Sequence, residues 1–400
     1  MPSREEGGRR GASFLLTPLG IVFTTVVIDL VGFGIVLPIL PLWAETFGAS
    51  PVQIGLITAS YAVAQLIFAP VWGRLSDRYG RRPIILLSLA GTVVGSLMIG
   101  LAGTLLVLFL ARVLQGVAGA SYAAAQAYVA DVTSARERAH GMGLIGAAFG
   151  LGFVLGPALG AVASAADHRL PFFIAAGLAA LNLLIAWKRL PESRREGAAA
   201  APAPRLAAVR RALAGRDLAP LVWLSFVANF AFIGMESTFA LFGAWRFGYG
   251  PVAMGLLFTL IGVMAAVSQG MLVRPLVARS GEHRVMLAGL VGTAAGLLGL
   301  AASETLWLLI PSLIVLAVAS GLVFSTTTAL ISLAGGDHEQ GMVLGLTASI
   351  GSAARIAAPL VATVLFQHVG IAVPLVVGAA LFAVCAAGAA RVSGHPATAA

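Results

Sequence analysis

Long apolar runs follow one another along almost the whole chain and are separated by short polar breaks. An apolar run of about twenty residues is long enough to cross the hydrocarbon core of a bilayer as a helix. Twelve runs approach this length: 18–40, 52–72, 83–102, 104–128, 140–165, 170–188, 220–243, 251–273, 285–302, 304–330, 341–366 and 370–391. The pattern predicts an all-α membrane protein with twelve transmembrane helices.

The longest polar break, residues 189–219, separates the first six runs from the last six. It is charged and rich in alanine and proline, which favours a cytoplasmic linker, with a short amphipathic helix near 205–214. The predicted order is a cytoplasmic N-terminus (1–17), an N-terminal six-helix bundle (18–188), the linker (189–219), a C-terminal six-helix bundle (220–391) and a cytoplasmic tail (392–400).

The two halves resemble each other at an almost constant offset of 200 or 201 residues. Three pairs of segments match: 47–56 with 247–256, 141–147 with 341–347, and 75–82 with 276–283. Parallel six-helix repeats with a substrate site at their interface are a transporter architecture. The repeat therefore predicts two pseudo-symmetric six-helix bundles.

The positions of the charges predict an orientation. Charged residues make up 10% of the chain and the formal net charge is +9, whereas a soluble protein carries roughly a quarter charged residues. With the N-terminus inside, the outer loops hold only Arg169 and Arg246, while Arg112 and Arg355 fall within spans. Because basic residues concentrate in cytoplasmic loops, we expect both termini to be cytoplasmic. The same rule accounts for the positive net charge, so we expect no nucleic-acid partner.

One polar stretch, GRLSDRYGRRP at 73–83, stands between the second and third runs. It matches the loop signature of the major facilitator superfamily, which the chain resembles over nearly its whole length. The matching residues are Gly73, Leu75, Asp77, Arg78, Gly80, Arg81 and Arg82. The resemblance implies the major facilitator fold and a secondary transporter, and it says little about the substrate.

The resemblance also implies a gating role for this stretch. Asp77 is a carboxylate at the inner face, and the eleventh run begins near Gly341. Because a helix N-terminus attracts an anion, we expect Asp77 to hold the two halves together on the inside. The arginines are expected to pair with Asp131 or Glu137 and with anionic lipid headgroups. The alternative is that they only fix the topology.

The fifth run carries a second signature. Its residues Gly143, Gly152, Gly156, Pro157 and Gly160 resemble the antiporter signature of drug-exporting members of the family. Glycines allow helices to pack closely, and a proline removes one helix hydrogen bond and permits a bend. The resemblance implies export rather than uptake. The alternative is ordinary small-residue packing, since the chain has 48 glycines.

Two ionisable residues are candidates for proton coupling in the first half. Arg112 and Gly116 resemble the family's proton-transfer signature, and Asp29 resembles an opening typical of drug/proton antiporters. A charge inside the membrane is costly and is usually paired or functional. The depths of Asp29 and Arg112, about 16 Å and about 24 Å from the inner ends of their runs, permit pairing. The alternative is a static ion pair that fixes helix packing.

The second half offers Glu236 and Arg355. Glu236 is a candidate for proton coupling or for binding a cationic drug, and Arg355 could neutralise it or contact an anionic group of the substrate. Uncharged polar residues could line a cavity or only bridge helices: Gln65, Gln115, Gln126, Asn229 and Gln269.

Within the superfamily the chain is most similar to the tetracycline exporter group. The stretches PLWAETFGAS and ADVTSARERAHGMGLIGAAFGLGF carry this resemblance. Two departures from the group, Gly95 in place of an acid and Ala265 in place of a histidine, make tetracycline itself a doubtful substrate. We therefore expect proton-coupled efflux of amphipathic compounds across the bacterial cytoplasmic membrane. The alternative is proton-coupled uptake or export of a metabolite such as a sugar or an organic anion.

The remaining expectations are absences. The single cysteine, Cys385, excludes a disulfide within the chain, and the sequence has no metal-ligand spacing. We find no catalytic Ser/His pairing and no nucleotide-binding loop, so we expect no enzyme activity and no ATP-driven transport. The expected energy source is the proton gradient without any cofactor, and the expected form is a monomer.

Overall fold

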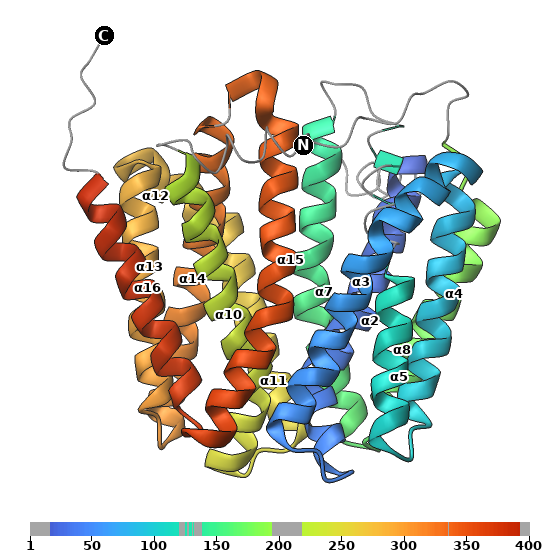
Figure 1. The fold of residues 1–400 in the computed structure, drawn as a ribbon, viewed down its shortest axis with the longest axis horizontal. Helices are drawn as coiled ribbons and strands as arrows, with labels where there is room; N and C mark the ends of the chain where they lie inside the picture. The colour runs from blue at the N-terminus through green and yellow to red at the C-terminus, as the bar shows by residue number, and fades with distance from the viewer. Residues whose placement is uncertain are drawn as a thin grey trace, which may run out of the picture. The chain divides into compact units, whose positions relative to one another are not determined.

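The computed structural model describes residues 17–119, 125, 128, 129, 131, 138–193, 218–334 and 336–392. Every regular element in these ranges is a helix (Figure 1). The elements are α2 (Pro18–Glu45), α3 (Pro51–Tyr79), α4 (Arg81–Gly100), α5 (Leu105–Ala118), α7 (Arg138–Ser164), α8 (Leu170–Arg189), α10 (Leu218–Phe247), α11 (Pro251–Val267), the π-helical turn η1 (Ser268–Leu272), α12 (Val273–Ser280), α13 (Glu282–Ala301), α14 (Leu306–Ala334), α15 (Gly336–His368) and α16 (Val373–Val392).

In the part of the chain that the structure describes, all twelve predicted runs lie on helices. Eleven of these helices are long and apolar enough to cross a membrane, and the shorter apolar helix α5 carries residues 105–118 of the fourth run. The predicted amphipathic helix near 205–214, Gln126 and Glu137 lie outside the described residues. The prediction of an all-α protein with twelve spans is therefore confirmed.

The helices extend beyond the apolar runs. The stretch 73–83 was expected to be a loop, but residues 73–79 continue α3 and Arg81 already begins α4, so the connection is Gly80 alone. Asp77 and Arg81 lie on the two sides of Gly80 and form an ion pair between the end of α3 and the start of α4. The polar signature is therefore mainly helical.

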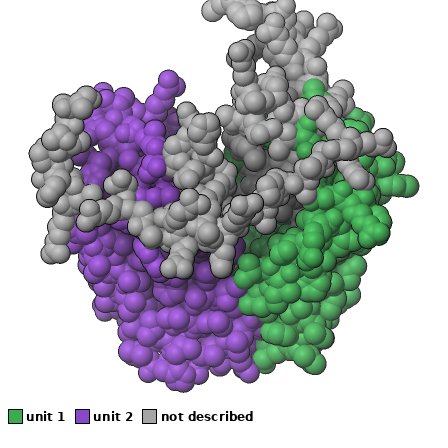
Figure 2. All heavy atoms as spheres, turned by 45° about the horizontal axis from the view of Figure 1, so that its top comes forward, with its two compact units in different colours: residues 1–48, 60–201, 251–259 green, residues 49–59, 202–250, 260–400 purple. Residues whose placement is uncertain are grey.

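Contacts divide the chain into two compact units, coloured separately in Figure 2. Unit 1 comprises residues 1–48, 60–201 and 251–259, and unit 2 comprises residues 49–59, 202–250 and 260–400. In unit 1, α2 packs on α7 and α8, and α4 packs on α5 and α8. In unit 2, α10 packs on α15 and α16, and α13 packs on α14 and α16.

Glycines bring the helices of unit 2 together. A Cβ atom placed on Gly296 of α13 would lie 2.7 Å from the backbone nitrogen of Leu316 in α14, and one on Gly299 would lie 2.4 Å from Ser312 Oγ. Small residues at helix interfaces in membranes allow such close backbone approach. The high glycine content is thus part of how this chain packs.

The first turns of α3 and α11 each pack on a helix of the opposite half of the sequence. Gly55 of α3 packs on α15, where an added Cβ would lie 2.9 Å from the carbonyl oxygen of Pro359. Gly255 of α11 packs on α7, where an added Cβ would lie 2.9 Å from the carbonyl oxygen of Pro157. Gly55 and Gly255 stand at the same position of the repeat, so the matched segments make matched contacts.

The backbone supports the repeat as well. Glycines with positive φ end matched helices: Gly48 (76°) and Gly248 (70°) follow α2 and α10, and Gly80 (104°) and Gly281 (77°) precede α4 and α13. Residues with a Cβ rarely adopt such φ values. The offsets of 200 and 201 residues are therefore visible in the conformation of the chain.

Candidate functional site

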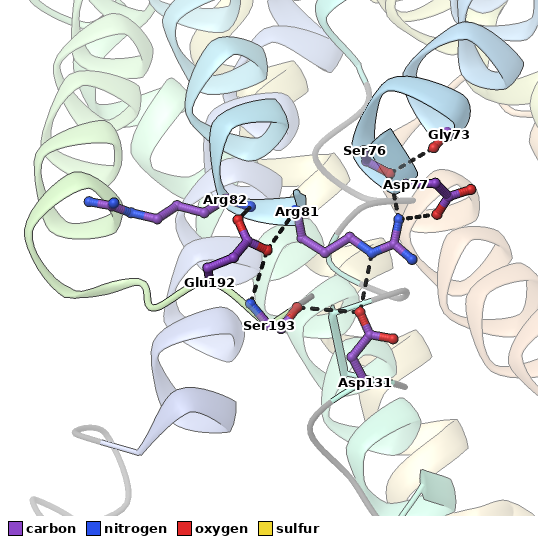
Figure 3. Close-up of polar contacts among 8 residues, drawn as sticks. All are labelled: Gly73, Ser76, Asp77, Arg81, Arg82, Asp131, Glu192 and Ser193. Atoms are coloured by element: carbon purple, nitrogen blue, oxygen red, sulfur yellow. Dashed lines mark hydrogen bonds and ion pairs between the residues drawn. The ribbon is translucent and has the colours of Figure 1, made fainter. Parts of the chain in front are cut away.

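The end of unit 1 where α3 meets α4 holds a network of charged side chains around Arg81 (Figure 3). Arg81 donates to Asp131 Oδ2 through Nε at 3.2 Å and to Ser76 Oγ through Nη1 at 2.8 Å. The same Nη1 also forms an ion pair with Asp77. The pairing of a signature arginine with Asp131, which the sequence suggested, is present in the structure.

Glu192 completes the network, and the sequence analysis missed it. Its carboxylate accepts hydrogen bonds from the backbone N–H groups of Arg81 (2.8 Å) and Arg82 (3.2 Å), the first residues of α4. A carboxylate at a helix N-terminus satisfies free N–H groups and is favoured by the helix dipole. Ser193 links it further by donating to Asp131 at 3.3 Å. The only signal in the sequence was an acid directly after a predicted span.

Gly80 is required for this arrangement. A Cβ at this position would lie 2.3 Å from Glu192 Oε2, and φ is 104°. A side chain there would therefore clash with the carboxylate and strain the backbone. By contrast, a Cβ on Gly73 would meet nothing within 4 Å.

The other two arginines of the signature have contacts of their own. Arg82 donates to the carbonyl oxygen of Trp187 at 2.6 Å. The guanidinium carbon of Arg78 lies 5.3 Å from the centroid of the Tyr79 ring.

The expected latch between Asp77 and the eleventh span remains a prediction. The carboxylate of Asp77 pairs with Arg81 of its own unit, and Gly341 belongs to the other unit. Lipid contacts of the arginines also remain a prediction.

The glycines of the fifth run hold α7 against α2. A Cβ on Gly152 would lie 2.6 Å from Leu30 Cβ, and a Cβ on Gly156 would lie 2.6 Å from the Cα of Gly34. A Cβ on Gly160 would lie 2.8 Å from Cδ1 of Ile39. Gly143 and Pro157 both lie within α7. These contacts are close helix packing, and the link between this signature and the direction of transport remains a prediction.

Arg112 is the buried charge of unit 1. Its residue is 6% exposed, and its Nη1 donates to Gln115 Oε1 at 2.8 Å. Gln115 in turn donates to Ser96 Oγ at 3.2 Å. The guanidinium carbon lies 4.4 Å from the centroid of the Tyr61 ring, a cation–π distance. Helices α3, α4 and α5 thus each contribute one contact to a single polar cluster.

The sequence predicts the importance of Arg112 and names Asp29 as its candidate partner. Asp29 lies half-buried in α2, and its pairing with Arg112 remains a prediction. The observed neighbours are Gln115 and Tyr61. Gly116 explains the approach of Tyr61, because an added Cβ there would lie 2.3 Å from the Tyr61 carbonyl oxygen.

The uncharged polar candidates were expected either to line a cavity or to bridge helices, and the structure shows different contacts for them. Gln65 donates to the carbonyl oxygen of Gly119 at 3.1 Å and so links α3 to the end of α5. Asn229 donates within its own helix to the Ser225 carbonyl oxygen at 2.8 Å. Gln269 is exposed in η1. Gln65 and Gln115 therefore bridge helices in the structure, whereas a role of Gln269 in lining a cavity remains a prediction.

In unit 2, Glu236 of α10 is half-buried and Arg355 of α15 is exposed. Among the described residues, three or more His, Cys, Asp or Glu side chains nowhere gather into a group that could hold a metal ion.

Comparison with known proteins decides the family. The model of the Major Facilitator Superfamily matches residues 22–274 and 247–398. The chain belongs to this superfamily. It is 32% identical over 376 residues to the tetracycline resistance protein, class C, of Escherichia coli. The aligned region covers 91% of this chain and 94% of that protein. It is 28% identical over 355 residues to multidrug resistance protein 2 of Bacillus subtilis (strain 168), covering 87% and 88%.

Solved structures agree with the assignment to the major facilitator superfamily. The human organic anion transporter MFSD10 superposes with a TM-score of 0.70 at 27% identity, over 93% of this chain and 98% of that one. The nucleoside transporter NupG superposes with a TM-score of 0.75 at 13% identity, over 95% and 100%, which shows the fold alone. The protein is thus a multi-pass membrane protein with the major facilitator fold.

One departure from the tetracycline exporters now has a physical explanation. A Cβ on Gly95 would lie 2.4 Å from Cγ of Gln115, so an acidic side chain cannot stand there while Gln115 holds Arg112. This superfamily member therefore fills the place of the expected acid with an amide from α5. Ala265, the second departure, lies in α11 one turn before η1.

Proposed function

We propose that this protein exports amphipathic drugs in exchange for protons across the bacterial cytoplasmic membrane. The observation that carries the proposal is the Arg112 cluster: a guanidinium buried in a membrane-spanning region of a chain whose full-length relatives are named for tetracycline and multidrug resistance. A buried charge in a span is costly and is retained where it has a function.

The proposed roles follow the positions of the residues. Asp29 carries the proton, Arg112 sets its affinity, and Glu236 is a second ionisable residue of the transport path. Residues Gly73, Asp77, Arg78, Gly80, Arg81, Arg82 and Asp131 form the inner gate. Gln65, Gln115, Asn229, Gln269 and Arg355 contribute to substrate binding. The chain acts as a monomer with both termini in the cytoplasm, and it needs the proton gradient but no cofactor or enzymatic step.

The proposal is tested by drug susceptibility in a pump-deficient bacterium. The wild-type chain should raise the inhibitory concentrations of several amphipathic drugs, and collapse of the proton gradient should abolish the effect. Asp29→Asn should remove resistance at unchanged protein level. Asp167→Asn is the matched control, because Asp167 lies in an exposed turn. Full resistance in Asp29→Asn would reject the coupling role of this residue.

The alternative, proton-coupled uptake or export of a metabolite such as a sugar or an organic anion, is not favoured, because the relatives are named for tetracycline and multidrug resistance. Measurement of radiolabelled substrate in intact cells separates the two, because an importer accumulates its substrate and an exporter depletes it.

A further inference from the structure

Two opposite charges in unit 2 lie deep within spans. Glu236 stands 11 residues before the end of α10 and Arg355 stands 13 residues before the end of α15. At 1.5 Å per residue these positions are about 16 Å and about 20 Å from the helix ends. Since a hydrocarbon core is about 30 Å thick, both charges lie near the middle of the membrane.

The two helices touch beside these charges. A Cβ on Gly234 of α10 would lie 3.4 Å from the Cβ of Ala362 in α15. Glu236 lies two residues beyond Gly234, and Arg355 lies about two turns before Ala362.

Neither charge is neutralised by direct contact in the part of the chain that the structure describes. The ion pairs among the described residues are those of Arg81 and Arg246. The hydrogen bonds among these residues include none that Arg355 donates and none that Glu236 accepts. An unpaired charge at this depth cannot face lipid without a cost of several kcal/mol. The exposed guanidinium must therefore face water or a ligand.

The surroundings of Arg355 leave room for a ligand. A Cβ on Gly351, one turn earlier on α15, would meet nothing within 4 Å. On α10, Asn229, Phe232 and Glu236 follow one another at spacings of three and four and so share one helix face. The ring of Phe232 packs edge-on against Phe324 at 5.5 Å. An amide, an aromatic surface and a carboxylate thus lie in line on α10.

We propose that this site selects zwitterionic amphipaths, with Arg355 binding the anionic group, Glu236 the cationic group, and the Phe232 face the apolar ring system. The inference deepens the proposed export function and rests on it. Two opposite charges that form no ion pair with each other among the described residues fit a ligand with two opposite charges, because each then gains a charge-assisted hydrogen bond. A ligand with one charge leaves either Arg355 or Glu236 without a partner.

The test uses three forms of one scaffold. A fluoroquinolone with a free amine and a free carboxylate is the zwitterion, its methyl ester is the cation, and its N-acetyl derivative is the anion. Binding to the purified protein is measured by fluorescence, and efflux is measured in proteoliposomes with an imposed proton gradient. The wild type should bind the zwitterion at least about tenfold more tightly than either derivative, since a hydrogen bond to a charged group contributes about 1.5–3 kcal/mol.

The two variants should change selectivity in opposite directions. Arg355→Gln should weaken binding of the zwitterion and the anion about tenfold and leave the ester unchanged. Glu236→Gln should weaken binding of the zwitterion and the ester and leave the anion unchanged. Arg355→Lys and Glu236→Asp should restore part of the preference. Arg284→Gln, at an exposed position of α13, is the matched control, and thermal unfolding of each purified variant confirms folding.

The outcomes separate this inference from the export function. Equal effects of Arg355→Gln on all three compounds, or none on any, would overturn the zwitterion site. Gradient-driven efflux of the ester alone would also overturn it while leaving proton-coupled export intact. Tight binding of the zwitterion with the expected variant pattern but without gradient-driven efflux supports the site and contradicts export.

Discussion

Unit 1 holds Arg112 and unit 2 holds Arg355, each within a predicted apolar run, and the two arginines have opposite environments. Arg112 is 6% exposed, is held by Gln115 and lies against the ring of Tyr61. Arg355 is exposed and has no hydrogen bond within the described residues. The same side chain therefore serves two purposes. Arg112 is fixed by its own protein, whereas Arg355 is left open to be satisfied by something else.

Glycines account for much of this difference. Gly95 and Gly116 lie beside Arg112 without side chains, and this lets Gln115 and Tyr61 approach the guanidinium. Near Arg355, the glycine one turn away, Gly351, faces open space instead. Glycine thus closes the structure around one arginine and leaves space beside the other. Packing, rather than the identity of the charged residue, decides which charge is available to a ligand.

The largest effect should come from breaking the closed environment at its centre. Arg112→Met leaves the buried amide of Gln115 without its charged partner, and a buried polar group left unsatisfied costs about 1–3 kcal/mol. We expect efflux to fall at least about 100-fold, which corresponds to roughly 2.7 kcal/mol. Arg112→Lys should not rescue, because an ammonium lacks the planar fork that both donates and stacks. Proteoliposome efflux at matched protein amounts is the measurement, and near-normal transport by the Lys variant would contradict the assigned geometry.

This outcome also marks how far the sequence leads. The apolar runs predicted all twelve spans, and the offset of 200 predicted a repeat, with which the contacts of Gly55 and Gly255 agree. Periodicity gives the depth of a residue in its span but not the neighbour it faces. Arg112 was therefore expected beside Asp29, and its contacts with Gln115 and Tyr61 became visible only in the structure.

Contacts across long sequence separations were also out of reach. Glu192 caps α4 from a position 111 residues away from Arg81, and no local pattern marks that partner. The exposure of Arg355 could not be predicted either. In the sequence, Arg112 and Arg355 each stand as an arginine within an apolar run, and nothing in the run shows whether the side chain is buried or exposed. What the sequence does supply is the set of residue types, and the packing then assigns them their roles.

The difference in exposure can be measured directly by chemical labelling. In a Cys385→Ser background, which removes the only cysteine, Arg355→Cys should react with a water-soluble maleimide at least about tenfold faster than Arg112→Cys, because thiol reactivity requires access. Excess zwitterionic fluoroquinolone should slow only the Arg355→Cys reaction. Equal labelling rates at the two positions would remove the basis of the comparison.

A smaller effect is expected from filling the space at Gly95. In Gly95→Ala the new Cβ would lie 2.4 Å from Cγ of Gln115, so the amide must shift away from Arg112. Overpacking of this kind costs typically about 1–3 kcal/mol, and we expect a lower unfolding temperature and reduced efflux. Gly177→Ala is the matched control in the same unit, because a Cβ there would meet nothing within 4 Å.

A double-mutant cycle sharpens this prediction. Combined with Gln115→Ala, the Gly95→Ala change should cost clearly less than it does alone, because the atom it strikes has been removed. Residues in contact typically show such coupling at about 0.5–3 kcal/mol. Additive losses of unfolding free energy would show that the strain lies elsewhere.

The smallest effect concerns the ring over Arg112. The guanidinium carbon lies 4.4 Å from the Tyr61 centroid, and a cation–π contact contributes about 0.5–2 kcal/mol depending on desolvation. Tyr61→Leu should therefore lower efflux several-fold, whereas Tyr61→Phe, which keeps an aromatic face, should retain more of it. The matched change on the open side, Phe232→Leu, should affect only the apparent affinity for the drug, because Arg355 does not depend on that ring for its position. If Tyr61→Leu instead changed drug affinity alone, Arg112 would itself belong to the drug-binding surface, and the contrast between a fixed and an open arginine would no longer hold.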